Sequence, residues 1–220
     1  MNDHLNFVKL DPDGIPSKLK ELFPLEMPQS KRCFAVLDGI EREGKVLTDD
    51  PDDPTWAVVQ ERYENTVFFG GEFNQTIAAQ IITELRKVGE VIVGLWHQDP
   101  TLALLPPDNY YDGAALEFYD RPIGEGLEKY FENVPASHEL RMFDRELVMK
   151  TEWGAGDVEL AGSLENWEQD FIGCGLIRNG EVIAEASAGP PCRGIYEPGV
   201  FTREAHRGNG YGILVSARLI

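Results

Sequence analysis

The chain has few of the residues that build disulfide-bonded, metal-binding or membrane proteins. Its 220 residues include only three cysteines, Cys33, Cys174 and Cys192, and none of these forms a Cys-x-x-Cys pair. An odd number of widely spaced cysteines favours neither a disulfide framework nor a zinc site. No apolar run approaches the about 20 residues of a membrane-spanning helix, and Met1–His4 is polar, unlike a signal peptide. We therefore predict a cytoplasmic protein with no metal site and no membrane partner.

Basic residues are also scarce. The chain carries 20 Lys and Arg against 38 Asp and Glu, a formal charge of -18. Such a surface repels phosphate backbones and anionic lipids, which excludes nucleic acid as an expected partner. The densest acidic run, Asp49–Asp53, is broken by Pro51 and lacks the spacing of a calcium loop, so we predict a solvated loop there. The balance reverses only from Arg193 onward, where four arginines face two glutamates.

The apolar content, 42% of residues, is sufficient for a real core, and its pattern predicts an N-terminal α/β domain over residues 1–135. A short helix is expected near Ser17–Phe23. Three β-rich runs follow, at Cys33–Asp38, Thr55–Gln60 and Thr66–Phe73. The clearest helix spans Asn74–Val88, where Asn74 or Thr76 is a candidate cap, and a buried strand is expected at Glu90–Trp96.

A second domain is predicted over residues 136–220, after a short helix at Gly124–Asn133. Its expected elements are a strand and helix in Glu139–Met149, a helix at Ser163–Phe171 capped by Ser163, and a hairpin of residues 171–178 and 181–188. Asn179-Gly180 between the two strands is a strong signal for a type I′ turn. A last strand is expected at Tyr196–Thr202. The fold class that these patterns favour is α/β (α+β), with a mixed, mostly antiparallel sheet flanked by helices.

The segment from Gly199 to Ile220 carries the most chemistry: a strand, a glycine-rich loop and the start of a helix. Gly208, Gly210 and Gly212 leave successive backbone amides unobstructed by Cβ atoms, and a helix start adds unpaired amides and a positive dipole end. These features predict a phosphate cradle. A P-loop is excluded because no Lys-Ser or Lys-Thr follows the glycines. A dinucleotide fingerprint is excluded because the spacing is Gly-x-Gly-x-Gly.

The run Arg207-x-x-Gly210-x-Gly212 resembles the pyrophosphate-binding signature of the GNAT superfamily of N-acetyltransferases. The order helix, hairpin, strand, glycine loop and helix in residues 136–220 is similar to the middle of a GNAT domain. Phe171–Gly175 and Glu197–Thr202 resemble a branch with a long N-terminal region, which contains the zwittermicin A resistance-type acetyltransferases. The N-terminal domain, which has no phosphate loop, is then expected to be a degenerate, non-catalytic GNAT-like half.

The resemblance implies transfer of an acetyl group from acetyl-CoA directly to a small-molecule amine, and the acidic surface favours a cationic acceptor. Backbone groups of Phe201 and Thr202 would align the thioester, and Arg207 would add a positive charge beside the pyrophosphate. The amides that would bind the pyrophosphate belong to Gly208, Asn209, Gly210, Tyr211 and Gly212. A carboxylate would take the proton of the amine, with Glu197 as first candidate and Glu185 as second.

The resemblance ends early, because GNAT domains continue past this helix into further strands and the chain stops at Ile220. Tyr211, Leu214, Val215 and Leu219 form one apolar face of the last helix, and Ile213, Ala217 and Ile220 the other. A helix that is apolar all round is expected to be covered on both sides. The chain is therefore interpreted as a truncated form, or as one that covers this helix through a homodimer or strand exchange. The alternative is a non-catalytic module that binds CoA or another protein.

Overall fold

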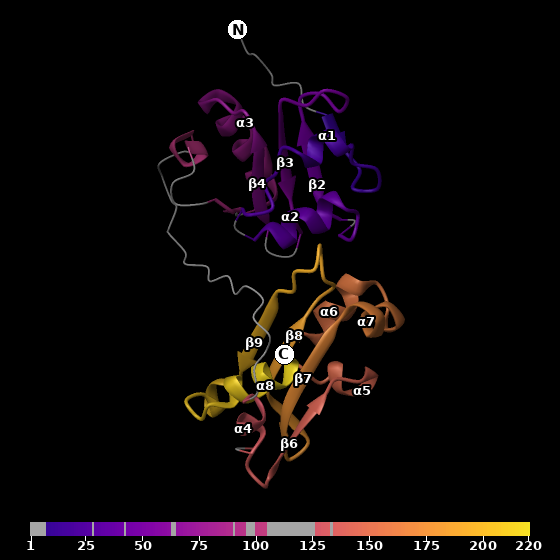
Figure 1. The fold of residues 1–220 in the computed structure, drawn as a ribbon, viewed down its shortest axis with the longest axis vertical. Helices are drawn as coiled ribbons and strands as arrows, with labels where there is room; N and C mark the ends of the chain where they lie inside the picture. The colour runs from indigo at the N-terminus through magenta and orange to yellow at the C-terminus, as the bar shows by residue number, and fades with distance from the viewer. Residues whose placement is uncertain are drawn as a thin grey trace. The chain divides into compact units, whose positions relative to one another are not determined.

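The computed structural model describes residues 8–27, 29–41, 43–62, 65–89, 91–95, 100–104, 126–132 and 134–220. The chain forms two compact units, Met1–Leu116 and Glu117–Ile220. Each unit is built around a sheet of its own (Figure 1). The predicted fold class, α+β with mostly antiparallel strands flanked by helices, is confirmed, whereas the predicted domain boundary after residue 135 stays a prediction.

The N-terminal unit contains a five-stranded sheet in the order β1-β2-β3-β4-β5. The first four strands pair antiparallel and β5 pairs parallel to β4. The parallel step requires a crossover, which α3 supplies between β4 and β5. The strands are β1 (Val8–Leu10), β2 (Lys45–Thr48), β3 (Trp56–Gln60), β4 (Thr66–Gly71) and β5 (Ile92–Val93).

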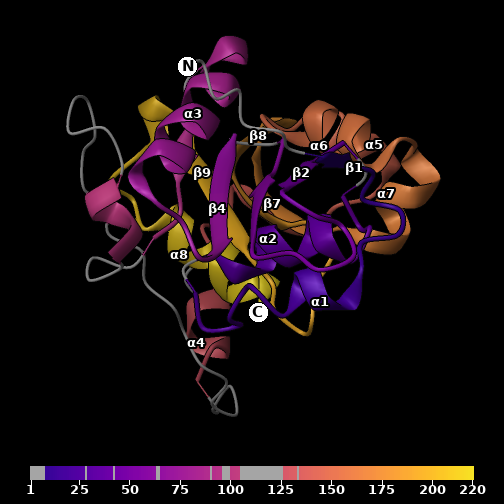
Figure 2. The same cartoon turned by 90° about the horizontal axis from the view of Figure 1, so that it is seen from above.

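Helices cover both faces of this sheet, and Figure 2 shows α3 and α2 on either side of β4. They are α1 (Ser17–Lys20), α2 (Ser30–Leu37) and α3 (Gln75–Leu85), and two 3₁₀ turns follow, η1 (Arg86–Val88) and η2 (Pro100–Leu104). Ile81 and Leu85 of α3 pack against Trp56, Val58 and Val67 of the sheet in one buried cluster. Of the two candidate caps of α3, the structure selects Asn74, whose side chain accepts a hydrogen bond from the amide of Ile77.

The prediction of a strand at Cys33–Asp38 is wrong, because this segment lies in α2. Cys33 through Leu37 are buried, as a core strand would be, and a short apolar run does not distinguish a buried strand from a buried helix. The expected buried strand at Glu90–Trp96 is reduced to Ile92–Val93, where Ile92 is exposed. Glu90 and Trp96 themselves lie outside the described residues.

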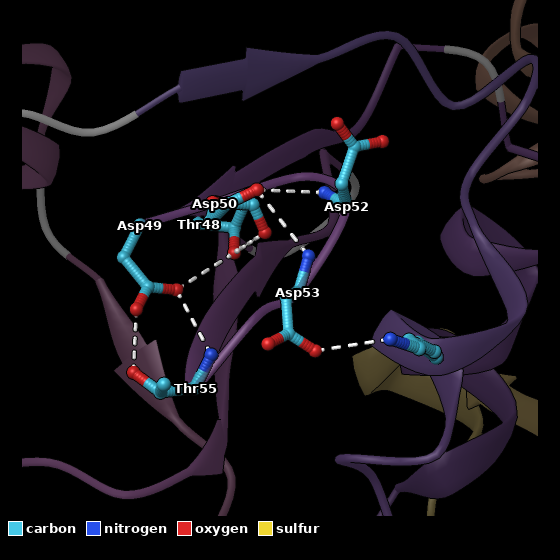
Figure 3. A network of polar contacts seen from close by, with 7 residues as sticks. Thr48, Asp49, Asp50, Asp52, Asp53 and Thr55 are labelled. Carbon is cyan, nitrogen blue, oxygen red and sulfur yellow. Dashed lines mark hydrogen bonds and ion pairs between the residues drawn. The ribbon is translucent and has the colours of Figure 1, made fainter.

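The acidic run between β2 and β3 forms a turn that uses its own carboxylates (Figure 3). Asp49 accepts hydrogen bonds from the amide and the hydroxyl of Thr55, and Asp50 accepts from the amide of Asp52 at 2.8 Å. The Asp53 carboxylate forms an ion pair with Lys18 at 3.0 Å. Backbone amides and a lysine therefore engage these carboxylates in an exposed turn, as predicted for a solvated loop.

The C-terminal unit contains a four-stranded sheet in the order β6-β7-β8-β9, and every pair in it is antiparallel. In the described parts of the whole chain, every helix is too short or too polar to traverse a lipid bilayer. The elements of this unit are α4 (Glu128–Phe131), β6 (His138–Met142), α5 (Arg145–Val148), α6 (Gly154–Ala161), α7 (Leu164–Asp170), β7 (Ile172–Arg178), β8 (Glu181–Ala188), β9 (Pro198–Thr202), η3 (Glu204–His206) and α8 (Tyr211–Leu219).

Two local predictions for this unit are confirmed. Asn179 and Gly180 have φ of 52° and 82°, as a type I′ turn between β7 and β8 requires. The Ser163 hydroxyl accepts a hydrogen bond from the amide of Asn166 and caps α7. Helix α6, by contrast, was not expected.

The two faces of the C-terminal sheet are chemically different. On one face, Ala184 and Ala186 of β8 pack in a buried cluster with Leu214 and Val215 of α8. On the other face, the Phe143 ring lies over β7 so closely that a Cβ on Gly173 would meet it at 2.2 Å. This second face also carries Glu185, which alternates with the alanines along β8.

The two units share one connectivity. In each unit a first strand is followed by helices, then by three strands that pair antiparallel in sequence order, and then by a helix that packs on the sheet. Helix α3 in the N-terminal unit corresponds in this order to α8 in the C-terminal unit. The starts of these two helices can therefore be compared directly.

We predict opposite stability effects for two Gly→Ala substitutions in the C-terminal unit. Gly173→Ala should lower the free energy of unfolding by about 1–3 kcal/mol, because the added methyl overlaps the Phe143 ring. Gly156→Ala, in an open position within α6, should raise it by about 0.5–1 kcal/mol because glycine loses more backbone entropy on folding. Urea titrations of the two variants measure both effects, and a stabilised Gly173→Ala variant would contradict the packing of Phe143.

Candidate functional site

The glycine-rich loop joins β9 to α8 through η3. Gly208 and Gly210 have φ of 78° and 75°, in the left-handed region, and a Cβ at either position would meet nothing within 4 Å. Glycine is therefore needed for the backbone path rather than for packing. The loop is braced from within: Asn209 Nδ2 donates to the carbonyls of His206 and Arg207, at 3.0 and 3.1 Å.

The start of α8 is open to a ligand. Its N-cap is Gly210, and no side chain caps the helix. The amide of Ile213 donates to the carbonyl of Gly210 at 3.1 Å, whereas the amides of Tyr211 and Gly212, at the first two positions, have no partner inside the helix and lie at the positive end of its dipole. The Nε atom of Arg207 donates to the carbonyl oxygen of Thr202 at 3.0 Å, which holds the guanidinium beside the loop. The structure thus brings together an uncapped nine-residue helix, two glycines and a cation.

The register of β9 determines which backbone groups face its open edge. The amide of Arg203 donates to the carbonyl of Ile183, so Phe201, two residues earlier, also directs its backbone groups toward β8. The backbone groups of Val200 and Thr202 then point away from β8. Within the described residues no strand pairs with that outer edge.

Glu185 lies on β8 directly opposite Phe201, and only 2% of its surface is exposed. Its Oε2 atom accepts from the amide of Glu152 at 2.9 Å, and Oε1 accepts from the amide of Trp153 at 3.2 Å. Burial raises the pKa of Glu185, and the two amide hydrogen bonds oppose that rise. Both oxygens are thus engaged with the backbone that leads into α6.

Comparison with known proteins assigns the chain to a family. The family model described as GNAT acetyltransferase matches residues 25–220, which is most of the chain. The chain belongs to the GNAT acetyltransferase family. It is therefore a transferase, from a family that generally uses acetyl-CoA as the acyl donor. No curated protein gives a significant match.

Two solved structures share the GNAT fold with this chain. A GCN5-related N-acetyltransferase-like protein from Streptococcus suis 89/1591 is 21% identical, with a TM-score of 0.58 over 80% of this chain and 72% of that one. A tandem GNAT protein from the clavulanic acid biosynthesis pathway, solved without acetyl-CoA, is 13% identical, with a TM-score of 0.57 over 98% and 84%. At these identities the likeness concerns the fold alone.

The two acidic candidates in the GNAT chain occupy different environments. Glu197 precedes the first residue of β9, Pro198, and its side chain is partly exposed. Glu185 is buried near the other end of β9, opposite Phe201. The five residues of β9, Pro198–Thr202, make four steps that together span about 13 Å at a rise of about 3.3 Å per residue. Glu197 can therefore exchange protons with solvent, whereas Glu185 is shielded from it.

The sequence analysis did not identify Asp157, a buried carboxylate on α6 that is 8% exposed. Its Oδ2 atom accepts a long hydrogen bond of 3.5 Å from the hydroxyl of Ser187 on β8. Burial, with a further contribution from the charge of Glu185, raises the pKa of Asp157 to about 6. The sequence pattern did not indicate Asp157, because Gly154 and Gly156 weaken the helical pattern of α6 and no local motif includes this acid.

The second apolar face of α8 is exposed in part, although its pattern predicted cover, and Ala217, which the sequence analysis placed on it with Ile213 and Ile220, is buried. Leu214, Val215 and Ala217 are buried, whereas Ile213 and Ile220 are 56% and 65% exposed. The cover that we expected for this face, from a second copy or an exchanged strand, stays a prediction. Nowhere in the described residues do three or more His, Cys, Asp or Glu side chains converge in a way that could hold a metal ion.

Asp157 should make stability depend on pH. Its folded pKa of about 6 lies above the ordinary value of 3.8, so the folded state binds the proton more tightly and this contribution to stability is lost as pH rises from about 4 to 6. Asp157→Asn should remove that loss, so its free energy of unfolding should gain on the parent's as pH rises through this window. Urea titrations from pH 4 to 8 measure the difference, with exposed Asp170→Asn as the control. A constant difference between Asp157→Asn and the parent at every pH would contradict the burial of a titrating carboxylate.

Proposed function

We propose that this GNAT chain transfers an acetyl group from acetyl-CoA directly to an amine, and that the Arg207–Gly212 loop binds the pyrophosphate. The observation that carries the proposal is the start of α8, where an N-cap glycine leaves the first-turn amides uncapped. The amides proposed to bind the pyrophosphate are those of the loop, Gly208 and Asn209, and those of the helix start, Gly210, Tyr211 and Gly212. Arg207, held to the carbonyl of Thr202, supplies a positive charge at the same place.

The thioester arm would lie along the open edge of β9. The outward-facing amide of Thr202 and the backbone groups of Val200 are placed to align it, since they point away from β8, while the carbonyl of Thr202 accepts from Arg207. Phe201 contributes differently: its backbone faces β8, and its ring contacts Trp153 with centroids 5.8 Å apart. Phe201 thus supports the strand from the α6 face while Thr202 faces the cofactor.

In the reaction, the amine nitrogen attacks the thioester carbonyl carbon, a C–N bond forms and the C–S bond breaks. The amide product and free CoA thiol result once a proton has passed from the amine nitrogen to a base and the thiolate has gained one from solvent. Glu197 is the base in this proposal, because it is partly exposed and can release the proton to water. Glu185 is disfavoured for this role, since both its oxygens already accept amide hydrogen bonds.

The N-terminal unit is proposed to bind no cofactor. Its corresponding helix α3 is capped by Asn74, whose side chain satisfies an amide that a phosphate would need. The acid Glu72 precedes this helix, where Arg207 precedes α8. The chain should therefore bind one acetyl-CoA.

The phosphate loop is tested by Gly210→Asp and Gly210→Asn. Both side chains tolerate the left-handed φ at this position and have nearly the same shape, so the comparison isolates the negative charge. Asp should weaken acetyl-CoA binding relative to Asn by about 1–4 kcal/mol, the repulsion of unit charges about 4 Å apart at effective dielectric constants between 80 and 20. Isothermal titration calorimetry measures both affinities and the stoichiometry. Equal affinities would overturn the loop assignment, and two cofactors per chain would overturn the assignment of the N-terminal unit.

The base is tested by Glu197→Gln. Loss of a general base should lower kcat/KM by about 10²–10⁴-fold, while acetyl-CoA still binds. Thiol release across a panel of primary amines measures the rate, and exposed Glu204→Gln provides a matched control. A Glu197→Gln variant that keeps the parent's rate and pH profile would exclude this residue as the base.

A second function is supported by the exposed face of α8. Ile213 and Ile220 offer exposed apolar surface to another protein. The alternative function is therefore a non-catalytic module that binds CoA or another protein. Binding of acetyl-CoA without thiol release from any amine of the panel would favour it.

A further inference from the structure

Trp153 lies where the start of α6 meets β9. Its ring contacts the Phe201 ring with centroids 5.8 Å apart and a tilt of 58°. It also packs on Gly199, where a Cβ would lie 2.8 Å from the Trp153 ring. Trp153 as a residue is only partly buried. An aromatic surface therefore lies along the strand on which the thioester is proposed to lie.

Glu185 fixes this ring through the backbone. Its two oxygens accept the amides of Glu152 and Trp153, the residues that lead into α6. Burying a carboxylate is unfavourable unless it is hydrogen-bonded or paired. Here the two amides and the attractive charge of Arg203 offset part of the cost of that burial, although the pKa of Glu185 stays raised. If the carboxylate were displaced, the Trp153 amide would lose its hydrogen bond to β8.

We propose that Glu185 is a positioning residue that holds Trp153 against β9, and that the Trp153 ring binds the ammonium group of a cationic amine acceptor. The proposal rests on the proposed acetyl transfer, because it is the thioester on β9 that brings the acceptor to this ring. Attack by a neutral amine places a positive charge on nitrogen before its proton leaves. The face of a tryptophan ring is the aromatic surface that attracts such a cation best.

The charges around Trp153 favour the same acceptor. Asp157 lies one turn further along α6, where it contacts Ser187, and Glu152 is exposed beside the ring's own residue. The chain as a whole carries a formal charge of -18. Arg203 is a cation close to Glu185, but the excess of carboxylates still attracts a cation and repels an anionic acceptor.

The test compares Trp153→Leu with Trp153→Phe, and Glu185→Gln with Glu181→Gln, an exposed glutamate on the same strand. With n-hexylamine as acceptor, Trp153→Leu should raise the acceptor KM by about two- to thirtyfold, and Trp153→Phe should restore part of the loss. Glu185→Gln should raise the KM similarly, and the double variant Glu185→Gln, Trp153→Leu should be no worse than Trp153→Leu. Glu181→Gln should keep the parent's KM. A fall in kcat at unchanged KM, or additive losses in the double variant, would overturn the positioning role.

A binding measurement decides the question without turnover. Saturation-transfer NMR with n-hexylammonium in the presence of CoA should give a signal that Trp153→Leu reduces severalfold and Trp153→Phe reduces less, while neutral 1-hexanol shows no such dependence. An ammonium signal that is equal in all three proteins would overturn the role of Trp153. Thermal unfolding with acetyl-CoA is measured alongside: a parent chain that gains no stability from the cofactor contradicts the proposed function, whatever the NMR result for the ring.

Discussion

The antiparallel pairing of β8 with β9 is the constraint on which the rest of the C-terminal unit depends. Its register places Glu185 opposite Phe201 and Ala184 opposite Thr202. Because side chains alternate between faces, the small alanines meet α8 and the carboxylate meets the residues that lead into α6. A slip of one residue would drive Glu185 among Leu214 and Val215. The apolar packing of α8 and the hydrogen bonds of Glu185 thus enforce the same register, and that register places the glycine loop directly after the open edge of β9.

The repeated connectivity of the two units shows how one arrangement of strands can present two chemically different helix starts. At α3 the Asn74 side chain accepts a hydrogen bond from the amide of Ile77, so one of the unpaired amides at the helix start is satisfied within the protein. At α8 the N-cap is glycine in the left-handed region, and no side chain caps the amides at the helix start. The residues before the helices differ in the same sense, an acid at Glu72 and a cation at Arg207. The contrast comes from a few side chains, because the order of strands and helices is shared.

Local features of this chain could be read from the sequence, and long-range ones could not. The glycine loop, the Asn179-Gly180 turn and the caps Asn74 and Ser163 depend on a few consecutive residues, and each was predicted at its place. The strand expected at Cys33–Asp38 failed because burial on most sides removes the periodicity that separates helix from strand. Helix α6 contains two glycines and depends on tertiary packing. The roles of Glu185 and Asp157 depend on partners about thirty residues away along the chain, which no local pattern specifies.

The burial of the cysteines bears on whether the reaction can pass through an acyl-enzyme intermediate. An acyl-enzyme route requires an accessible thiolate, and all three cysteines of the chain are buried. Cys174 is fully buried between the sheet and α8, its Sγ donates to the carbonyl of Val215 at 3.0 Å, and burial raises its pKa to about 11. At neutral pH such a thiol stays protonated and cannot attack a thioester. With all three thiols buried, an acyl-cysteine intermediate is disfavoured, which agrees with the proposed direct transfer to an amine. In that proposal the protein orients two substrates and accepts one proton, with buried Glu185 as the positioning residue and partly exposed Glu197 as the base.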